Sequence, residues 1–413
     1  MPPPPRLAIT GEPLAPADVV AVARHHRPVG LDPGARERMA ATRRLVDSLA
    51  ASDDPVYGVS TGFGSLALRR IPPGRRDDLQ RSLLRSHAAG MGPPVEEEVV
   101  RAMLLLRART LATGHTGARP EVAELLLALL DAGITPLVPE HGSLGCSGDL
   151  APLAHTGLAL IGEGTVLHGG ATRAAAEALA AAGLAPLELQ AKEGLSLING
   201  TDGMLGMLVL ACADLGRLLR TADVTAAMSV EALLGTDRPF ALELHALRPH
   251  PGQAESASNL GRLLTGSEIV ASHRTEDPRV QDAYSLRCAP QVAGAARDTL
   301  AFAEQVAERE LAAVVDNPVV LADGRIESVG NFHGAPLGFA CDFLAIAAAE
   351  VGAIAERRVD RMLDATRSHG LPPFLAAEPG VDSGLMIAQY TAAALVAENR
   401  RLAAPASVDS LPT

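Results

Sequence analysis

Long stretches in which apolar residues recur every three or four positions dominate this chain, and they predict helices. Several of these stretches open with proline or acidic residues and close on glycine, which is the usual order at the start and end of a helix. Two examples close on Gly114 and Gly133. The spacing predicts helices over residues 94–114, 119–133, 172–183, 201–235, 297–315, 337–363 and 383–405.

The long helix over residues 202–235 is apolar on nearly every face, which predicts burial within the protein or between subunits. Strand-like pieces are short and comprise "GTVLHGG" and "NPVVLADGRIESVG", the second around an Asp-Gly turn. Residues 1–30 have the pattern of a loose, proline-rich lead-in. We therefore predict a mainly α fold with a smaller loop-rich N-terminal region over residues 1–195 and a long central helix bundle over residues 196–413.

Composition narrows the class of protein. The chain has 413 residues, of which 47% are hydrophobic and only 2% aromatic, so its core is built from small and aliphatic side chains. A net charge of −12 without basic runs argues against nucleic acid or an anionic membrane as the main partner. No signal-peptide pattern and no apolar run long enough to span a bilayer are recognised, which predicts a cytoplasmic protein. The widely spaced Cys146, Cys212, Cys288 and Cys341 are expected to be reduced thiols.

Islands rich in glycine or proline separate the predicted helices, and each island carries polar residues able to do chemistry. Because catalytic groups tend to sit on loops of a rigid scaffold, these islands predict one composite site. The most unusual island is "HGSLGCSGDLAPLAH", which begins at His141 and has Gly142, Gly145 and Gly148 at every third position.

This glycine-rich turn has several possible chemical roles. Ser147 does not lie in a G-x-S-x-G elbow, and nothing near Cys146 obviously lowers the pKa of its thiol. The turn has no lysine for a phosphate cradle, and a purely structural turn remains an alternative. A Xaa-Ser-Gly turn can also cyclise, because the glycine nitrogen has no neighbouring Cβ to block its approach to the carbonyl two residues back. Loss of water from the ring and from Ser147 leaves an exocyclic methylene, which is a strong electrophile.

This turn resembles the signature of the aromatic amino acid ammonia-lyases, and especially of the histidine ammonia-lyases. Those enzymes form a methylidene-imidazolone (MIO) group from an Ala-Ser-Gly turn, and Cys146 stands at the usual alanine position, as in similar actinobacterial sequences. The resemblance covers almost the whole chain, through "VYGVSTGFG", "LLRSHAAGMG", "EGLSLINGTDGM", "RPHPGQ", "QDAYSLRCAPQ", "GNFHGAPL" and "PASVDSLPT".

The resemblance implies an ammonia-lyase/fumarase-like helical fold. It implies that L-histidine is deaminated without oxidation to trans-urocanate and ammonia. It further implies that MIO, formed from Cys146, Ser147 and Gly148, is the sole cofactor, and that a homotetramer shares each site between subunits.

The same resemblance assigns roles residue by residue. Tyr57 would remove a β-proton, and Asn199 would hydrogen-bond the MIO carbonyl or the amine. Arg287 would pair with the substrate carboxylate, with Tyr284 and Gln281 on the same face. From the residues alone, Tyr57 is also readable as a core aromatic, Asn199 as part of an Asn-Gly turn and Arg287 as half of a surface ion pair.

Specificity is predicted to rest on Ser86 and His87, which would face the substrate ring, with Phe332 at the border of the pocket. A histidine there can hydrogen-bond an imidazole. Because some tyrosine aminomutases also resemble this Ser-His pattern, an aromatic lyase or 2,3-aminomutase acting on Tyr or Phe stays an alternative. So do a non-catalytic subunit and a Ser/Cys hydrolase.

Two further expectations concern metals and the C-terminal segment. Neither His245 with His250 nor His141 with His155 has a recognised metal-ligand spacing, so no metal is expected. Family members continue beyond "PASVDSLPT" with an acidic motif and further helices. An exposed apolar helix surface is therefore expected near residues 384–404, which would favour association.

Overall fold

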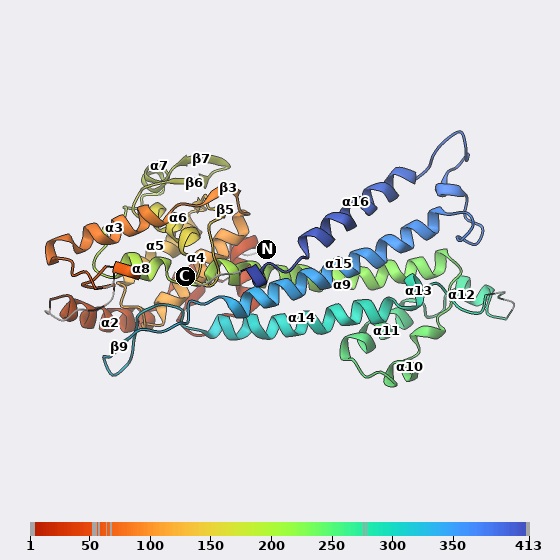
Figure 1. Cartoon of the computed structure of the whole chain (residues 1–413), viewed down its shortest axis with the longest axis horizontal. Coiled ribbons are helices and arrows are strands. Elements are labelled where there is room, and N and C mark those ends of the chain that lie inside the picture. Colours follow the sequence, from red (N-terminus) through yellow and green to blue (C-terminus); the bar gives the residue numbers. More distant parts are fainter. Residues whose placement is uncertain are drawn as a thin grey trace. The chain divides into compact units, whose positions relative to one another are not determined.

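The computed structural model of the chain describes residues 5–51, 56, 58–62, 64–66, 68–275, 277 and 279–409. The fold is mainly α, as predicted, with short strands (Figure 1). It divides into two compact units, the first comprising Met1–Leu210, Val306–Gly338 and Asp409–Thr413 and the second Ala211–Gln305 and Phe339–Val408. Three of the four unit boundaries fall inside long helices, which are α9 (Asp202–Ala232), α14 (Ala289–Ala312) and α15 (Ala335–Leu363). The proposed single boundary at residue 195 stays a prediction.

In its described residues, the first unit contains helices of 6 to 19 residues and four small sheets. Its helices are α1 (Pro16–His25), α2 (Pro33–Ala51), α3 (Arg76–His87), α4 (Glu97–Ala112), α5 (Pro120–Asp131), α6 (Leu150–Leu160), α7 (Ala175–Ala181) and α8 (Glu193–Ile198), with 3-10 turns η1 (Gly64–Leu66) and η2 (Pro73–Arg75). Its strands are β1 (Leu7–Ile9), β2 (Val29–Leu31), β3 (Met91–Pro94), β4 (Thr135–Pro136), β5 (Pro139–His141), β6 (Thr165–His168), β7 (Ala171–Ala174), β8 (Val319–Val320) and β9 (Ile326–Glu327).

Helix α4 is the centre of the first unit, because nearly all of its residues are buried. It packs against α1 and α5, while α6 packs against α3 and α8. The proline that begins α5 has no N–H to lose at the first helical position. These contacts place the ends of α3, α6 and α8 around the glycine-rich island.

The sheets are two- or three-stranded. Strands β6 and β7 pair antiparallel, and β8 and β9 pair antiparallel around the predicted Asp-Gly turn. Two expectations are wrong. Residues 172–174 belong to strand β7 instead of a helix, and residues 1–30 hold β1, α1 and most of β2, because Leu7–Ile9 pairs in parallel with Val29–Leu31.

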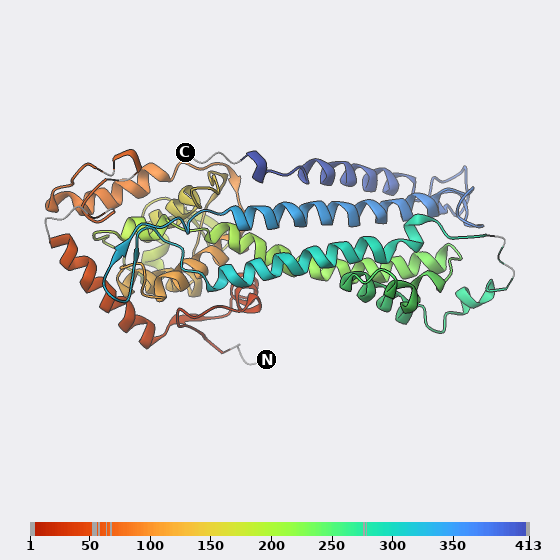
Figure 2. The ribbon, with the colours of Figure 1, turned by 60° about the horizontal axis from the view of Figure 1, so that its bottom comes forward.

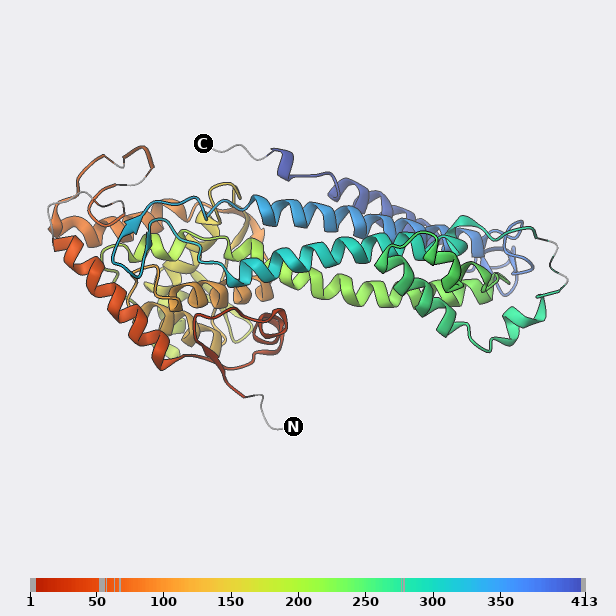
Figure 3. The ribbon, with the colours of Figure 1, turned by 90° about the horizontal axis from the view of Figure 1, so that it is seen from below.

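The second unit is a bundle of long helices that includes α16 (Met386–Leu402). Its shorter helices are α10 (Leu242–Ala246), α11 (Pro251–Leu263), α12 (Glu268–Ser272) and α13 (Tyr284–Arg287). Parts of α9, α14 and α15 run alongside one another in it, and α16 lies along α15 (Figure 2 and Figure 3). Gln389 of α16 donates a hydrogen bond to Glu356 of α15. The remaining elements are the 3-10 turns η3 (Arg238–Phe240), η4 (Pro373–Leu375) and η5 (Ser407–Asp409), and η5 contains the unit boundary between residues 408 and 409.

A buried cluster fixes the short helices of this unit. Val230 of α9, Leu233 directly after that helix, Leu260 of α11, Val270 of α12 and Leu286 of α13 pack together in it. The cluster therefore holds α13, which carries two of the predicted site residues, against the end of α9.

Two helical segments are long and apolar enough to cross a bilayer by length and composition, Glu193–Ala232 and α15. The expectation that no apolar run reaches that length is wrong on this criterion. The most apolar window of the first segment is 83% buried, as in the core helix of a soluble protein, whereas that of α15 is only 28% buried. The exposed apolar surface predicted near residues 384–404 is confirmed, since Ile387, Tyr390 and Leu395 of α16 are all more than half exposed.

Candidate active site

The glycine-rich turn lies between strand β5 and helix α6. Gly145 and Gly148 have φ angles of 75° and 77°, in the left-handed region that favours glycine. The Gly148 N–H donates to the Gly145 carbonyl oxygen at 3.1 Å and closes the turn around Cys146 and Ser147. Cys146 is buried and Ser147 half-buried, with 3.9 Å between their Sγ and Oγ atoms.

Two of the other islands hold this turn from both sides. The backbone N–H of Asp149 donates to the Gly200 carbonyl oxygen at 2.7 Å, and that of Gly334 donates to the Gly145 carbonyl oxygen at 2.9 Å. A Cβ at Gly148 would lie 2.6 Å from the Gly200 oxygen and 3.3 Å from the Phe332 oxygen. The turn is therefore packed so closely that only glycine fits at position 148.

The structure brings Asn199 and Phe332 to this turn, because they flank the residues that touch it. Asn199 is buried, and its side-chain amide donates to the carbonyl oxygen of Asn317 at 2.7 Å. Phe332 is half-buried, and its carbonyl oxygen lies beside Gly148. The predicted contact of Asn199 with an MIO carbonyl or a substrate amine stays a prediction.

Ser86 and His87 end helix α3. The Nδ1 of His87 lies 3.0 Å from both the Leu83 carbonyl oxygen and the Ser86 hydroxyl oxygen. Strand β3 begins four residues later and pairs with β5, with Met91 opposite His141. The β3–β5 strand pair thus follows His87 closely on one strand and leads into the glycine-rich turn on the other.

The other described site residues belong to the second unit. Gln281 and Tyr284 are exposed, and Arg287 is half-buried. The Arg287 guanidinium lies 4.6 Å from the centre of the Tyr284 ring, so the two side chains share a face as their spacing predicts. Its Nε donates to the Asp282 carbonyl oxygen at 3.0 Å. Tyr57 lies outside the described residues, and its role as base stays a prediction.

Sequence reasoning missed two buried carboxylates beside the turn. Asp149 accepts hydrogen bonds from the Ser143 hydroxyl at 2.6 Å and the Met204 N–H at 2.9 Å; burial raises its pKa and these bonds oppose the rise. Burial also raises the pKa of Asp202 to about 6, against the opposing charge of Arg107. The available signal was an aspartate directly after Ser-Gly and another in "NGTD".

A second buried ion pair lies in the same unit. The Lys192 ammonium is 2.7 Å from Asp316, and neither side chain is exposed. Burial lowers the pKa of Lys192 and raises that of Asp316, while their mutual attraction opposes both shifts. The Ser196 hydroxyl accepts a hydrogen bond from Lys192 at 3.1 Å, which ties this pair to helix α8.

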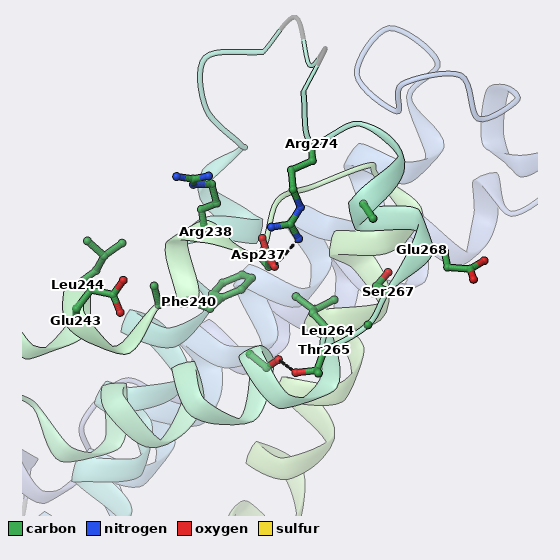
Figure 4. Close-up of a pocket in the computed structure, with 14 residues that line it drawn as sticks. Asp237, Arg238, Phe240, Glu243, Leu244, Leu264, Thr265, Ser267, Glu268 and Arg274 are labelled. Carbon is green, nitrogen blue, oxygen red and sulfur yellow. Dashed lines mark hydrogen bonds and ion pairs between the residues drawn. The ribbon is translucent and has the colours of Figure 1, made fainter.

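A separate cavity of about 860 Å³ lies in the second unit among η3, α10, α11 and α12 (Figure 4). An ion pair between Asp237 and Arg274, 3.0 Å apart, crosses its wall. None of the predicted site residues that the structure describes lines it. Among the described residues, no group of three or more His, Cys, Asp or Glu side chains is arranged to hold a metal ion.

Comparison with known proteins gives consistent matches. The family model "Aromatic amino acid lyase" matches residues 14–413. A histidine ammonia-lyase of Streptomyces coelicolor is 64% identical over 398 residues, which cover 96% of this chain and 78% of the relative. A histidine ammonia-lyase of Deinococcus radiodurans is 53% identical over 95% of this chain and 75% of its own length.

Solved structures share the fold over 99% of this chain. A tyrosine aminomutase from Streptomyces globisporus has a TM-score of 0.93, 40% identity and 81% of its chain covered. The histidine ammonia-lyase of Trypanosoma cruzi has a TM-score of 0.89, 38% identity and 77% of its chain covered. The predicted helical fold of the ammonia-lyase type is confirmed. The chain belongs to the aromatic amino acid lyase family.

Proposed function

We infer that this chain catalyses the non-oxidative deamination of L-histidine to trans-urocanate and ammonia. The observation that carries the inference is the 64% identity to a histidine ammonia-lyase across 96% of the chain. The site geometry supports it, because three islands far apart in the sequence meet at a turn in which Gly148 tolerates no side chain.

The residues of the turn fit the formation of an MIO group. The Gly148 nitrogen attacks the Cys146 carbonyl carbon, and the new N–C bond closes a five-membered ring. The carbonyl oxygen leaves as water with the hydrogens of the Ser147 and Gly148 backbone nitrogens, and a C=N bond forms to the Ser147 nitrogen. Ser147 then loses its Cα hydrogen and its hydroxyl as a second water, which creates the exocyclic methylene. The Cys146 side chain takes no part, so cysteine replaces alanine without changing the chemistry. The group supplies an electrophile for the substrate amine.

Substrate recognition is assigned to an arginine that binds the carboxylate, to a histidine and a serine that bind the imidazole, and to a phenylalanine beside the ring. Arg287 pairs with the substrate carboxylate through its guanidinium fork. The His87 ring hydrogen-bonds the imidazole of the substrate next to the Ser86 hydroxyl, and Phe332 borders the ring. The half-buried position of His87 at the end of α3 supports this role.

The proton chemistry is assigned to tyrosine and amide side chains. Tyr57 removes the β-proton of the substrate. Asn199 holds the cyclised turn or the amine, and its buried place directly before Gly200 supports that role. Tyr284 and Gln281 line the face that Arg287 shares.

We also propose a homotetramer whose sites are shared between subunits. The groove between α14 and α15 has a volume of about 680 Å³ and is lined by Phe302, Phe343 and Ile346. These side chains are 44–47% exposed, and the rings of Phe302 and Phe343 lie 5.8 Å apart. A contiguous apolar surface of this kind is typical of an association interface. The four cysteines form no disulfide with one another among the described residues, which fits the proposed cytoplasmic location.

The second candidate function is an MIO-dependent aromatic 2,3-aminomutase. It is favoured by the TM-score of 0.93 to a tyrosine aminomutase. A lyase releases ammonia and an unsaturated acid, whereas a mutase returns the amine to the neighbouring carbon, so the products separate the two.

The test is incubation of the purified chain with L-histidine, L-tyrosine and L-phenylalanine, with separation of the products by chromatography and mass detection. We expect urocanate and an equal amount of ammonia from histidine, and no product from a Ser147→Ala control. β-Tyrosine or β-phenylalanine as the main product would replace the lyase by the mutase. No product from any substrate would refute both.

A further inference from the structure

Arg107 of α4 is a buried arginine that the proposed chemistry does not use. It is 1% exposed, and its Nη1 donates to the carbonyl oxygens of Ser196 at 3.2 Å and Asn199 at 3.0 Å. Its Nη2 donates to the Val315 carbonyl oxygen at 2.9 Å. One guanidinium thus joins the end of α8 to the segment that follows α14.

The charge of Arg107 is matched by Asp202, whose Oδ2 lies 3.3 Å from Nε. Within the described part of the chain, neither of these two atoms makes a hydrogen bond of good geometry. A buried ion pair contributes little net stability, and this pair leaves two buried polar atoms without hydrogen bonds. Stability of the fold is therefore a poor reason for its presence.

A direct path of contacts leads from Arg107 to the glycine-rich turn. Arg107 holds the Asn199 carbonyl, and the next carbonyl along the chain, that of Gly200, accepts from the Asp149 N–H at 2.7 Å. A Cβ at Gly200 would overlap with Oδ2 of Asp202 and lie 2.8 Å from Nη1 of Arg107. Gly200 is therefore enclosed between the Arg107–Asp202 pair on one side and the Gly148–Asp149 peptide on the other.

We propose that Arg107, together with Asp202, is a positioning residue for the cyclisation of the turn, an inference that rests on the proposed function. Ring closure requires the Gly148 nitrogen to leave its 3.1 Å hydrogen bond to Gly145 and approach the Cys146 carbonyl carbon. By binding the Asn199 carbonyl, Arg107 fixes the adjacent Gly200 carbonyl, which contacts the Gly148–Asp149 peptide. The atoms that form and lose bonds belong to the turn, and Arg107 acts only through the backbone that it holds.

The same helix offers a matched control in Arg101. It is also 1% exposed, and it donates to the backbone carbonyl oxygens of Ala23, Leu130 and Val22 at 3.1, 3.3 and 2.9 Å. Those carbonyls lie at the ends of α1 and α5 and make no contact with the turn. Lysine at either position keeps the positive charge and loses the fork that binds several carbonyls at once.

The experiment compares the wild type, Arg107→Lys and Arg101→Lys in the full chain. Intact mass and peptide mapping give the fraction of chains that have lost two water molecules from the Cys146–Gly148 peptide, as a function of time after synthesis. Thermal unfolding followed by circular dichroism gives stability. We expect both variants to lose stability, and only Arg107→Lys to lose water about tenfold more slowly, which corresponds to about 1.4 kcal/mol in the barrier.

Equal rates of water loss in the two folded variants would overturn the proposal, because Arg107 would then have only the structural role of Arg101. If Arg107→Lys does not fold, Asp202→Asn provides the second test, since it keeps the arginine and removes its counter-charge. Water loss at the wild-type rate in Asp202→Asn would also overturn the proposal. A wild-type chain that loses no water would refute the proposed function itself, and this inference with it.

Discussion

Replacing Gly148 with alanine tests whether the close packing of the turn is what allows the electrophile to form. The φ of 77° costs a residue with a Cβ about 1–2 kcal/mol. The added Cβ would lie 2.6 Å from the Gly200 oxygen, whereas ordinary contact begins at 3.4 Å. The oxygen must retreat and weaken its hydrogen bond from Asp149, which costs about another 1 kcal/mol. The turn is thus destabilised by about 2–3 kcal/mol.

Gly133 provides the control for this prediction. It has a φ of 64°, and nothing lies within 4 Å of an added Cβ. Gly133→Ala therefore carries the cost of the left-handed backbone without the collision. The difference between the two variants isolates the contact with Gly200.

The assay combines urea unfolding with intact mass. To remove the effect of the finished ring, the free energies of unfolding are compared in the Ser147→Ala background, where no methylene can form. We expect Gly148→Ala to lose about 1 kcal/mol more than Gly133→Ala. In the Ser147 background, Gly133→Ala should lose two waters and Gly148→Ala should keep both and make no urocanate. Full water loss in Gly148→Ala, or equal stability of the two variants, would refute the packing argument.

Four further predictions test other parts of the molecule. His87→Leu should raise the KM for histidine about tenfold, with a smaller change in kcat, because one hydrogen bond to the ring is lost; steady-state kinetics measure this. Lys192→Met should reduce the free energy of unfolding in urea by about 3–5 kcal/mol, because it leaves the Asp316 carboxylate buried and unpaired; a loss under about 1 kcal/mol would contradict it. The pKa of Asp202 is raised from 3.8 to about 6, so the folded state binds the proton more tightly than the unfolded state. The stability of the wild type relative to Asp202→Asn should therefore fall by up to about 3 kcal/mol as pH rises from about 4 to about 6. Urea unfolding curves of both proteins across that pH range measure the difference. Phe343→Asp should reduce the size of the assembly in sedimentation, because it places a charge in the apolar groove of α15.

The helices of this chain were predictable where their pattern is long and regular. The stretches that became α4, α5, α9, α15 and α16 were identified within a few residues at each end. The two N-terminal strands were missed because β1 and β2 have three residues each and exist through their pairing with one another. A strand of that length has no alternation to detect, and its stability comes from a partner that the local sequence does not reveal.

The turn at the centre of the site was predictable from the sequence, but the residues beneath it were not. The glycines and Ser147 lie together in one quoted stretch, so their chemistry could be argued locally. Arg107 stands in an apolar run of α4 and binds a carbonyl of Val315, 208 positions away. Nothing in the spacing of either residue predicts that contact, because only the tertiary fold brings them together.

The core of the first unit contains buried charged side chains close to the glycine-rich turn. Asp149, Asp202 and Asp316 are buried there with Arg107 and Lys192. Apolar side chains of similar volume would give equal or greater stability at such positions. What apolar side chains cannot do is hold backbone carbonyls and N–H groups at fixed places, as Arg107 does at Asn199 and Asp149 does at Met204. The proposed cyclisation, in which one backbone nitrogen attacks a neighbouring carbonyl, depends on such placement, and this is the reason to include the buried charges in the proposed site.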